Sequence, residues 1–97
     1  MRGDPPRLRR GLILLVLLEQ YPHQLARSIL ERHMEPAYHG QEVDREFFRD
    51  LAYLEDSGYI ERSQSRFGGR SVESFKITPK GIDVAERSVE DPGVELA

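Results

Sequence analysis

The most regular helical pattern in this chain lies in the stretch Val43-Asp-Arg-Glu-Phe-Phe-Arg-Asp-Leu-Ala-Tyr-Leu-Glu-Asp-Ser-Gly-Tyr-Ile60. Apolar side chains recur in it at the spacing of one helical face, at Val43, Phe47, Leu51 and Leu54. This spacing predicts an α-helix over residues 42–56. Ser57-Gly58 predicts its end, because glycine readily adopts the left-handed conformation in which many helices stop.

The segment after Gly58 changes its apolar period from near 3.6 to 2, which is the period of a β-strand. Residues 59–64 and 72–77 contain β-branched and aromatic side chains, and this composition predicts two short strands. Between them, Gly68-Gly69 supplies the positive φ angles that a tight reversal needs. The sequence therefore predicts an antiparallel β-hairpin whose basic tip carries Arg66 and Arg70.

Helical patterns flank this central part of the chain. Asp4-Pro5-Pro6 predicts a helix start, because the aspartate side chain can accept hydrogen bonds from the first backbone amides and proline fits the first turn. This helix is predicted to run to about Tyr21. Residues 23–34 carry a second apolar face at helical spacing. Thr78-Pro79 repeats the helix start near the C-terminus, and Asp91-Pro92-Gly93 is expected to end that last helix.

The composition sets the size and class of the fold. The chain has 97 residues, of which 38% are hydrophobic and 32% are charged, and this balance suits one small globular domain. We assign the domain to residues 5–90 and expect flexible termini at residues 1–4 and 91–97. The expected fold class is mainly α with a small antiparallel β-hairpin. The absence of cysteine excludes disulfides and thiolate metal sites and fits a cytoplasmic protein.

The charges are distributed unevenly along the chain. The formal net charge is −3, so any basic surface has to be local. Residues 58–81 carry five basic and two acidic side chains, whereas residues 31–57 carry eight acidic side chains and three arginines. A second basic cluster lies at the start of the chain, at Arg2, Arg7, Arg9 and Arg10. The pattern predicts two basic surfaces, one on each side of an acidic segment.

Seven consecutive apolar residues, 12–18, follow the N-terminal basic cluster. As a helix they span roughly 10 Å, about a third of a bilayer core, and no small-residue cleavage site follows them. We therefore expect a buried helix and no membrane segment. Apolar side chains lie on more than one face of this helix, which favours a second copy of the chain as a partner. We expect the homodimer interface at Ile13, Val16 and Leu17.

The sequence offers little to catalysis, metals or cofactors. Short helices and one hairpin leave little room for a cleft. Acid pairs such as Glu42 with Glu46 are ordinary neighbours on a helix surface. The three histidines lack the spacing of a metal site, at His23, His33 and His39. We expect no catalytic residue, no metal ligand and no cofactor.

The predicted order is helix, helix, helix, β-hairpin, helix, and two segments within it carry a resemblance. They are residues 43–60 and Phe75-Lys-Ile-Thr-Pro-Lys-Gly81, the second of which leads from a strand into a capped helix. The chain resembles the winged helix-turn-helix domain of the MarR, PadR and ArsR-like bacterial transcriptional regulators over about residues 8–90. The resemblance implies a regulator that binds double-stranded DNA as a dimer and has no catalytic centre.

The resemblance also implies which residues meet the DNA. The helix over residues 42–56 would be the recognition helix, and its contact residues would be Gln41, Asp44, Arg45, Phe48 and Arg49. The hairpin would be the wing, which contacts the DNA backbone or a minor groove through Arg66 and Arg70. Two of the arginines on the recognition helix lie one turn apart, which suits phosphates or a guanine edge.

Four acids in the recognition helix leave an alternative open. Glu42, Asp44, Glu46 and Asp50 would oppose phosphate binding if they faced DNA, whereas the arginines near the N-terminus could supply phosphate contacts. If the acids turn sideways, Asp44 meets the groove and can accept from cytosine. The competing function is a winged-helix protein–protein interaction module without direct DNA binding, using Tyr53, the apolar first helix and Phe48. Phe48 is either a second core wall, which we expect, or an exposed anchor.

Overall fold

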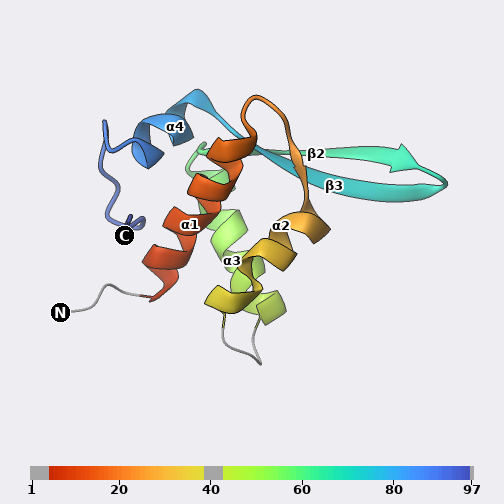
Figure 1. Ribbon diagram of the computed structural model, residues 1–97, viewed down its shortest axis with the longest axis horizontal. Helices are drawn as coiled ribbons and strands as arrows, with labels where there is room; N and C mark the ends of the chain where they lie inside the picture. The colour runs from red at the N-terminus through yellow and green to blue at the C-terminus, as the bar shows by residue number, and fades with distance from the viewer. Residues whose placement is uncertain (1–4, 39–42, 97) are drawn as a thin grey trace.

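The computed structural model describes residues 5–38 and 43–96. These residues form four α-helices, one short 3-10 helix and a three-stranded antiparallel sheet (Figure 1). The elements in chain order are α1 (Pro5–Gln20), β1 (Leu25–Ala26), α2 (Arg27–Met34), η1 (Glu35–Ala37), α3 (Val43–Asp56), β2 (Ile60–Phe67), β3 (Arg70–Ile77) and α4 (Pro79–Ala85). The four predicted helices and the hairpin are present, while β1 and η1 are additions that the sequence pattern does not predict. The predicted end of the last helix at Asp91-Pro92-Gly93 is wrong, because α4 ends at Ala85.

The sheet has the strand order β1-β3-β2. β2 pairs with β3 from Ile60 opposite Ile77 to Phe67 opposite Arg70, and a two-residue turn at Gly68-Gly69 joins them with φ angles of 59° and 79°. β1 covers the other edge of β3, where Leu25 lies opposite Phe75. The helix predicted over residues 23–34 therefore begins later, at Arg27, because residues 25–26 pair with the sheet instead.

The hydrophobic core lies around α1, which packs against α2, α3, α4 and β3 (Figure 1). Its buried side chains come from every α-helix and from both long strands, and they include Ile13, Leu14, Leu17, Leu30, Phe47, Leu54, Ile60, Ile77 and Val84. The predicted dimer interface at Ile13 and Leu17 is therefore wrong, since both side chains are fully buried within one protomer. Val16 is half-buried. Leu12 is exposed on the outward face of α1, between the half-buried Leu8 and Val16.

The C-terminal segment, residues 91–96, packs along α1. The amide of Glu95 donates to the carbonyl of Arg7 at 3.0 Å, and Val94 is buried. Gly11 permits this close approach, because a Cβ atom there would lie 2.2 Å from the carbonyl oxygen of Glu95. The prediction of a flexible tail beginning at residue 91 is therefore corrected for residues 91–96, which belong to the packed domain.

The cap of α4 is confirmed at Thr78, whose hydroxyl accepts from the amide of Gly81 at 3.1 Å. The same hydroxyl donates to the carbonyl of Gly58 at 2.7 Å. Gly58 has a φ angle of 83°, as expected for the residue that ends α3. Thr78 therefore ties the start of α4 to the end of α3. Within residues 5–38 and 43–96, no helix has the length and apolar character needed to cross a membrane.

Candidate nucleic-acid interface

The outward face of α3 carries four of the five residues predicted to read DNA. Asp44, Arg45, Phe48 and Arg49 are exposed, and the fifth, Gln41, lies outside the described residues. The opposite face of the helix packs into the core through Phe47, Leu51 and Leu54. Phe48 is 59% exposed, so the expectation that it forms a second core wall is wrong and the alternative, an exposed anchor, describes its position.

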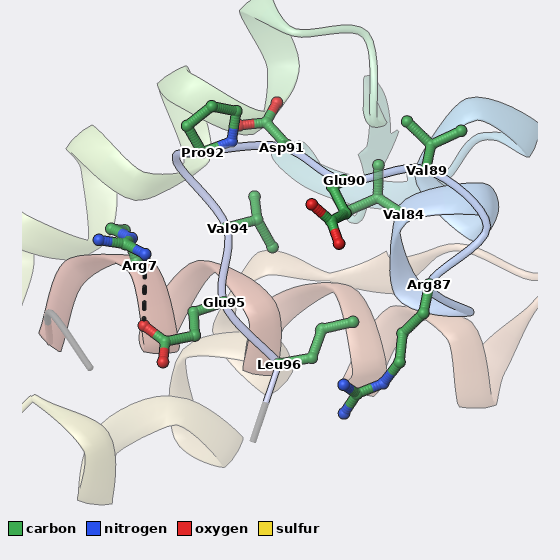
Figure 2. Close-up of a pocket in the computed structure, with 10 residues that line it drawn as sticks. All are labelled: Arg7, Val84, Arg87, Val89, Glu90, Asp91, Pro92, Val94, Glu95 and Leu96. Carbon is green, nitrogen blue, oxygen red and sulfur yellow. Dashed lines mark ion pairs between the residues drawn. The ribbon is translucent and has the colours of Figure 1, made fainter. Parts of the chain in front are cut away.

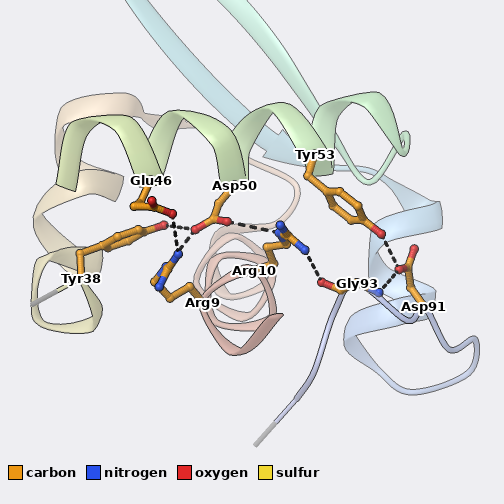
Figure 3. A network of polar contacts seen from close by, with 8 residues as sticks. All are labelled: Arg9, Arg10, Tyr38, Glu46, Asp50, Tyr53, Asp91 and Gly93. Carbon is orange, nitrogen blue, oxygen red and sulfur yellow. Dashed lines mark hydrogen bonds and ion pairs between the residues drawn. The ribbon is translucent and has the colours of Figure 1, made fainter. Parts of the chain in front are cut away.

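Asp50 lies on the inner side of α3 and is only 1% exposed (Figure 3). Its carboxylate accepts from Nε of Arg9 at 3.0 Å and from Nε of Arg10 at 3.2 Å, both on α1. The hydroxyl of Tyr38 also donates to it, at 2.7 Å. A buried carboxylate is stable only when it is paired and hydrogen-bonded in this way. Asp50 therefore fixes α3 against α1.

The pKa values around Asp50 reflect this burial. Burial lowers the pKa of Arg9, but the hydrogen bond and the negative charge of Asp50 outweigh it, and the pKa rises overall. Burial and the hydrogen bond to Asp50 raise the pKa of Tyr38 well above its ordinary value. Both shifts keep the groups in the protonated forms that bind the carboxylate at neutral pH.

Glu46 lies one turn before Asp50 and accepts from a terminal guanidinium nitrogen of Arg9 at 3.2 Å (Figure 3). Glu46 and Asp50 therefore face α1, as in the alternative in which these acids turn away from the outward face of α3, and Glu42 lies outside the described residues. Asp44 remains on the outward face. The same contacts correct the role expected for Arg9 and Arg10, whose side chains are mostly buried in ion pairs and unavailable to phosphates.

A second polar cluster joins the C-terminal segment to α3. The carboxylate of Asp91 accepts from the hydroxyls of Tyr53 and Tyr59 and from the amide of Gly93, with distances of 2.7 Å to Tyr53 and 2.6 Å to Gly93. Arg10 connects the two clusters, because it donates to the carbonyl of Gly93 at 3.0 Å (Figure 3). The contacts therefore run without interruption from α3 through α1 to the C-terminal segment.

The pKa values in this second cluster shift in opposite directions. Burial alone would raise the pKa of Asp91, but hydrogen bonds from Tyr59, Tyr53 and Gly93 outweigh it and lower the pKa below its ordinary value. The hydrogen bond to Asp91, together with burial and the charge of the carboxylate, raises the pKa of Tyr59 to about 12. The hydrogen bond to Asp91 also raises the pKa of Tyr53. The carboxylate and both phenols are thus held in their neutral-pH forms.

The hairpin projects from the body of the molecule (Figure 1). Every residue of β2 after Ile60 is exposed, and Arg66 and Arg70 lie beside its turn. Within the described part of the chain, no ion pair involves either arginine. Ion pairs fasten the base of the hairpin instead, where Arg62 lies 3.4 Å from Glu55 of α3 and 3.3 Å from Glu73 of β3.

A hollow of about 200 Å³ lies between α3 and the base of the hairpin. Phe48 and Ala52 of α3 line one side, and Arg62 and Phe75 of the hairpin line the other. The structure thus brings Phe48 next to the hairpin base, whereas Arg66 lies near the far end. Arg70 borders a different hollow, shared with Ser28 and Glu31 of α2.

A larger pocket, of about 600 Å³, lies away from the hairpin between α4, the loop that follows it and the C-terminal segment (Figure 2). It contains charges of both signs, and one edge is closed by an ion pair of 3.6 Å between Arg7 and Glu95. The described residues contain no group of three or more potential metal ligands.

Comparison with protein-family models, with curated proteins and with solved structures finds no significant match to this chain.

Proposed function

We propose that this chain is a sequence-specific, DNA-binding transcriptional regulator with a winged-helix fold that acts as a dimer. The observation that carries the proposal is the exposed face of α3, with Arg45, Phe48 and Arg49, beside a hairpin that ends in Arg66 and Arg70. The element order and the pairing of the short strand β1 with β3 support the winged-helix assignment. A helix beside an arginine-bearing hairpin matches the shape of duplex DNA, whose major groove admits one helix.

The recognition step places α3 in the major groove. Arg49 and Arg45 lie one turn apart and reach guanine edges or phosphates, and Phe48 makes apolar contact with a thymine methyl group. Asp44 can accept from the amino group of cytosine. The ion pairs of Glu46 and Asp50 with α1 support this arrangement, because they remove two negative charges from the surface that meets the phosphates.

Base reading also needs a helix that is held firmly, since small misplacements weaken directional hydrogen bonds. Asp50 meets this need through its contacts with Arg9, Arg10 and Tyr38, all of which lie on other segments. In this proposal the buried network is a positioning device for α3. It contributes no contact to DNA.

The dimer is proposed to form through the outward face of α1. Leu8, Leu12 and Val16 lie at successive turns of that face, and Leu12 is 42% exposed. A two-fold axis there would present two copies of α3 to one duplex, and each copy would read one half-site.

Selection of bound duplexes from a random pool tests this function. We expect enrichment of an inverted repeat whose half-sites are separated by about one helical turn, roughly 10 base pairs, or a multiple of it. Arg49→Ala should lose the enriched motif, whereas Arg32→Ala, an exposed arginine on α2, should keep it. A pool that shows no enrichment under low-salt conditions would contradict the proposal.

One observation favours a second function, a winged-helix interaction module for another protein. Phe48 is exposed and lines a hollow with Leu51 and Phe75, among charged side chains of α3 and the hairpin. Exposed aromatic residues are frequent anchors of protein interfaces. A salt series with duplex DNA separates the two functions. DNA binding loses affinity steeply as salt rises, whereas the interaction module has no measurable DNA affinity even at low salt.

A further inference from the structure

The end of the hairpin carries Phe67, which is 79% exposed and is the most exposed large apolar side chain among the described residues. It is the last residue of β2 and lies directly opposite Arg70 of β3. Each eight-residue strand spans about 26 Å, and β2 is exposed after its first residue, so this ring is held far from the core. Phe67 therefore has no packing role within one protomer.

The turn of the hairpin carries no side chain. Gly68 and Gly69 occupy both turn positions, and a Cβ atom at either would meet no other atom within 4 Å. Phe67 and Arg70 form a directly opposed pair, so their side chains lie on one face of the hairpin, while Arg66 points to the other face. The tip thus carries an aromatic ring and a cation on one face and a second cation on the other face.

The charge of the tip matches a polyanion. Residues 64–72 contain two arginines and no acid, and neither arginine is paired within the described part of the chain. The DNA minor groove is about 6 Å wide and strongly negative, so it admits a slim, cationic element and excludes a bulky one.

We propose that Phe67 is an apolar wedge that enters a minor groove beside the contacts of Arg66 and Arg70 and partly unstacks one base step. This inference rests on the proposed DNA-binding function and deepens it. Apolar side chains inserted from the minor groove kink the duplex toward the major groove. The kink costs least at flexible pyrimidine–purine steps, so Phe67 determines a preference for such a step without reading a base edge.

The position of the hairpin favours DNA over a lipid surface as the partner. The base of the hairpin shares a hollow with Phe48 of α3, so a helix in the major groove brings the hairpin onto the same duplex. A single aromatic ring offers little area for insertion into a membrane.

The test compares the full-length protein with Phe67→Ala, Phe67→Leu and Val89→Ala on one selected duplex labelled at both ends for energy transfer. Val89 is the matched control, because it is an exposed apolar residue that follows α4, away from the hairpin. We expect Phe67→Ala to weaken binding roughly tenfold and to reduce the bend, with an unchanged salt slope. Phe67→Leu should retain most of both effects, and Val89→Ala should match the wild type.

The outcomes distinguish the role of Phe67 as a wedge from the proposed DNA-binding function. Because the ring is exposed, Phe67→Ala should keep the wild-type circular dichroism and urea midpoint, so a loss of binding cannot come from unfolding. Wild-type affinity and bend in Phe67→Ala would overturn the wedge and leave DNA binding intact. A wild-type protein that binds no duplex would overturn both. If Phe67→Ala binds DNA like the wild type but no longer binds phosphatidylserine vesicles that the wild type binds, the tip contacts a membrane surface and the wedge is overturned.

Discussion

The carboxylate of Asp50 accepts a hydrogen bond from Nε of Arg9 at 3.0 Å, although the two residues lie 41 positions apart in the chain. This contact neutralises one charge in each of the two segments, the acidic one that contains Asp50 and the basic one that contains Arg9. Asp50 is removed from the surface of α3, and Arg9 is removed from the basic cluster at the N-terminus. In the proposed function, the outward face of α3 and the end of the hairpin make the contacts with DNA.

Removing the buried carboxylate should destabilise the fold strongly. Asp50→Ala leaves Arg9 and Arg10 without their shared partner, and breaking a buried ion pair in this way costs about 3–5 kcal/mol. Urea unfolding should therefore show a much lower free energy of unfolding. Asp44→Ala is the matched control on the exposed face of the same helix; it removes an acid from the first turn and should cost no more than about 1 kcal/mol. Equal effects in the two variants would contradict the role of Asp50.

Alkaline titration should reveal the Asp91 cluster. The hydrogen bond to Asp91 raises the pKa of Tyr59 from 10.0 to about 12. The folded state therefore keeps a proton that the unfolded state releases, so this contribution to stability is present below pH 10 and is lost as pH rises toward 12. Phenolate absorbance should show that Asp91→Asn lowers the pKa of Tyr59, whereas Asp83→Asn leaves it unchanged. An identical titration curve in Asp91→Asn would argue against this cluster.

The close approach at Gly11 can be tested by adding one methyl group. In the complete chain, Gly11→Ala forces its Cβ against the carbonyl of Glu95 and should release residues 94–96, which amide hydrogen exchange would detect. In a chain truncated after Pro92, the same substitution should stabilise α1 by up to about 1 kcal/mol, because only helix propensity remains. Stabilisation of both chains would mean that the C-terminal segment does not pack on α1.

The sequence predicts most of the secondary structure because the signals there are local. Helical periodicity identifies α3, paired glycines identify the hairpin turn, and Thr78-Pro79 identifies the start of α4. Strand β1 is too short to have a period of its own, and it exists because the edge of β3 is open to pairing. Local signals cannot report such a long-range partner.

The sequence does not show which face of α1 is buried, because residues 12–18 are all apolar and so every side of the helix is apolar there. Periodicity then cannot distinguish the core from the surface, and the prediction that places Ile13 and Leu17 at the surface is wrong. For Asp50 a usable signal was present. It lies three residues after Phe47 and four before Leu54, on the same apolar face, which predicts a buried acid that needs partners.

The corrected face of α1 gives a test of the dimer. Leu12→Glu should yield monomers in analytical ultracentrifugation, because the charge would be buried without a partner in the proposed interface. Ile29→Glu, at a similarly exposed position on α2, should remain dimeric. A monomeric wild type, or a dimer that tolerates Leu12→Glu, would rule out this interface.

The salt dependence of duplex binding tests the central claim most directly. The logarithm of the wild-type affinity should fall linearly with the logarithm of salt concentration, because phosphate contacts release counterions. The double variant Arg66→Ala/Arg70→Ala should bind more weakly and lower that slope by about 2 per protomer, roughly one for each lost phosphate contact. A wild-type affinity that does not respond to salt, or a double variant with the wild-type slope, would contradict DNA binding through the hairpin.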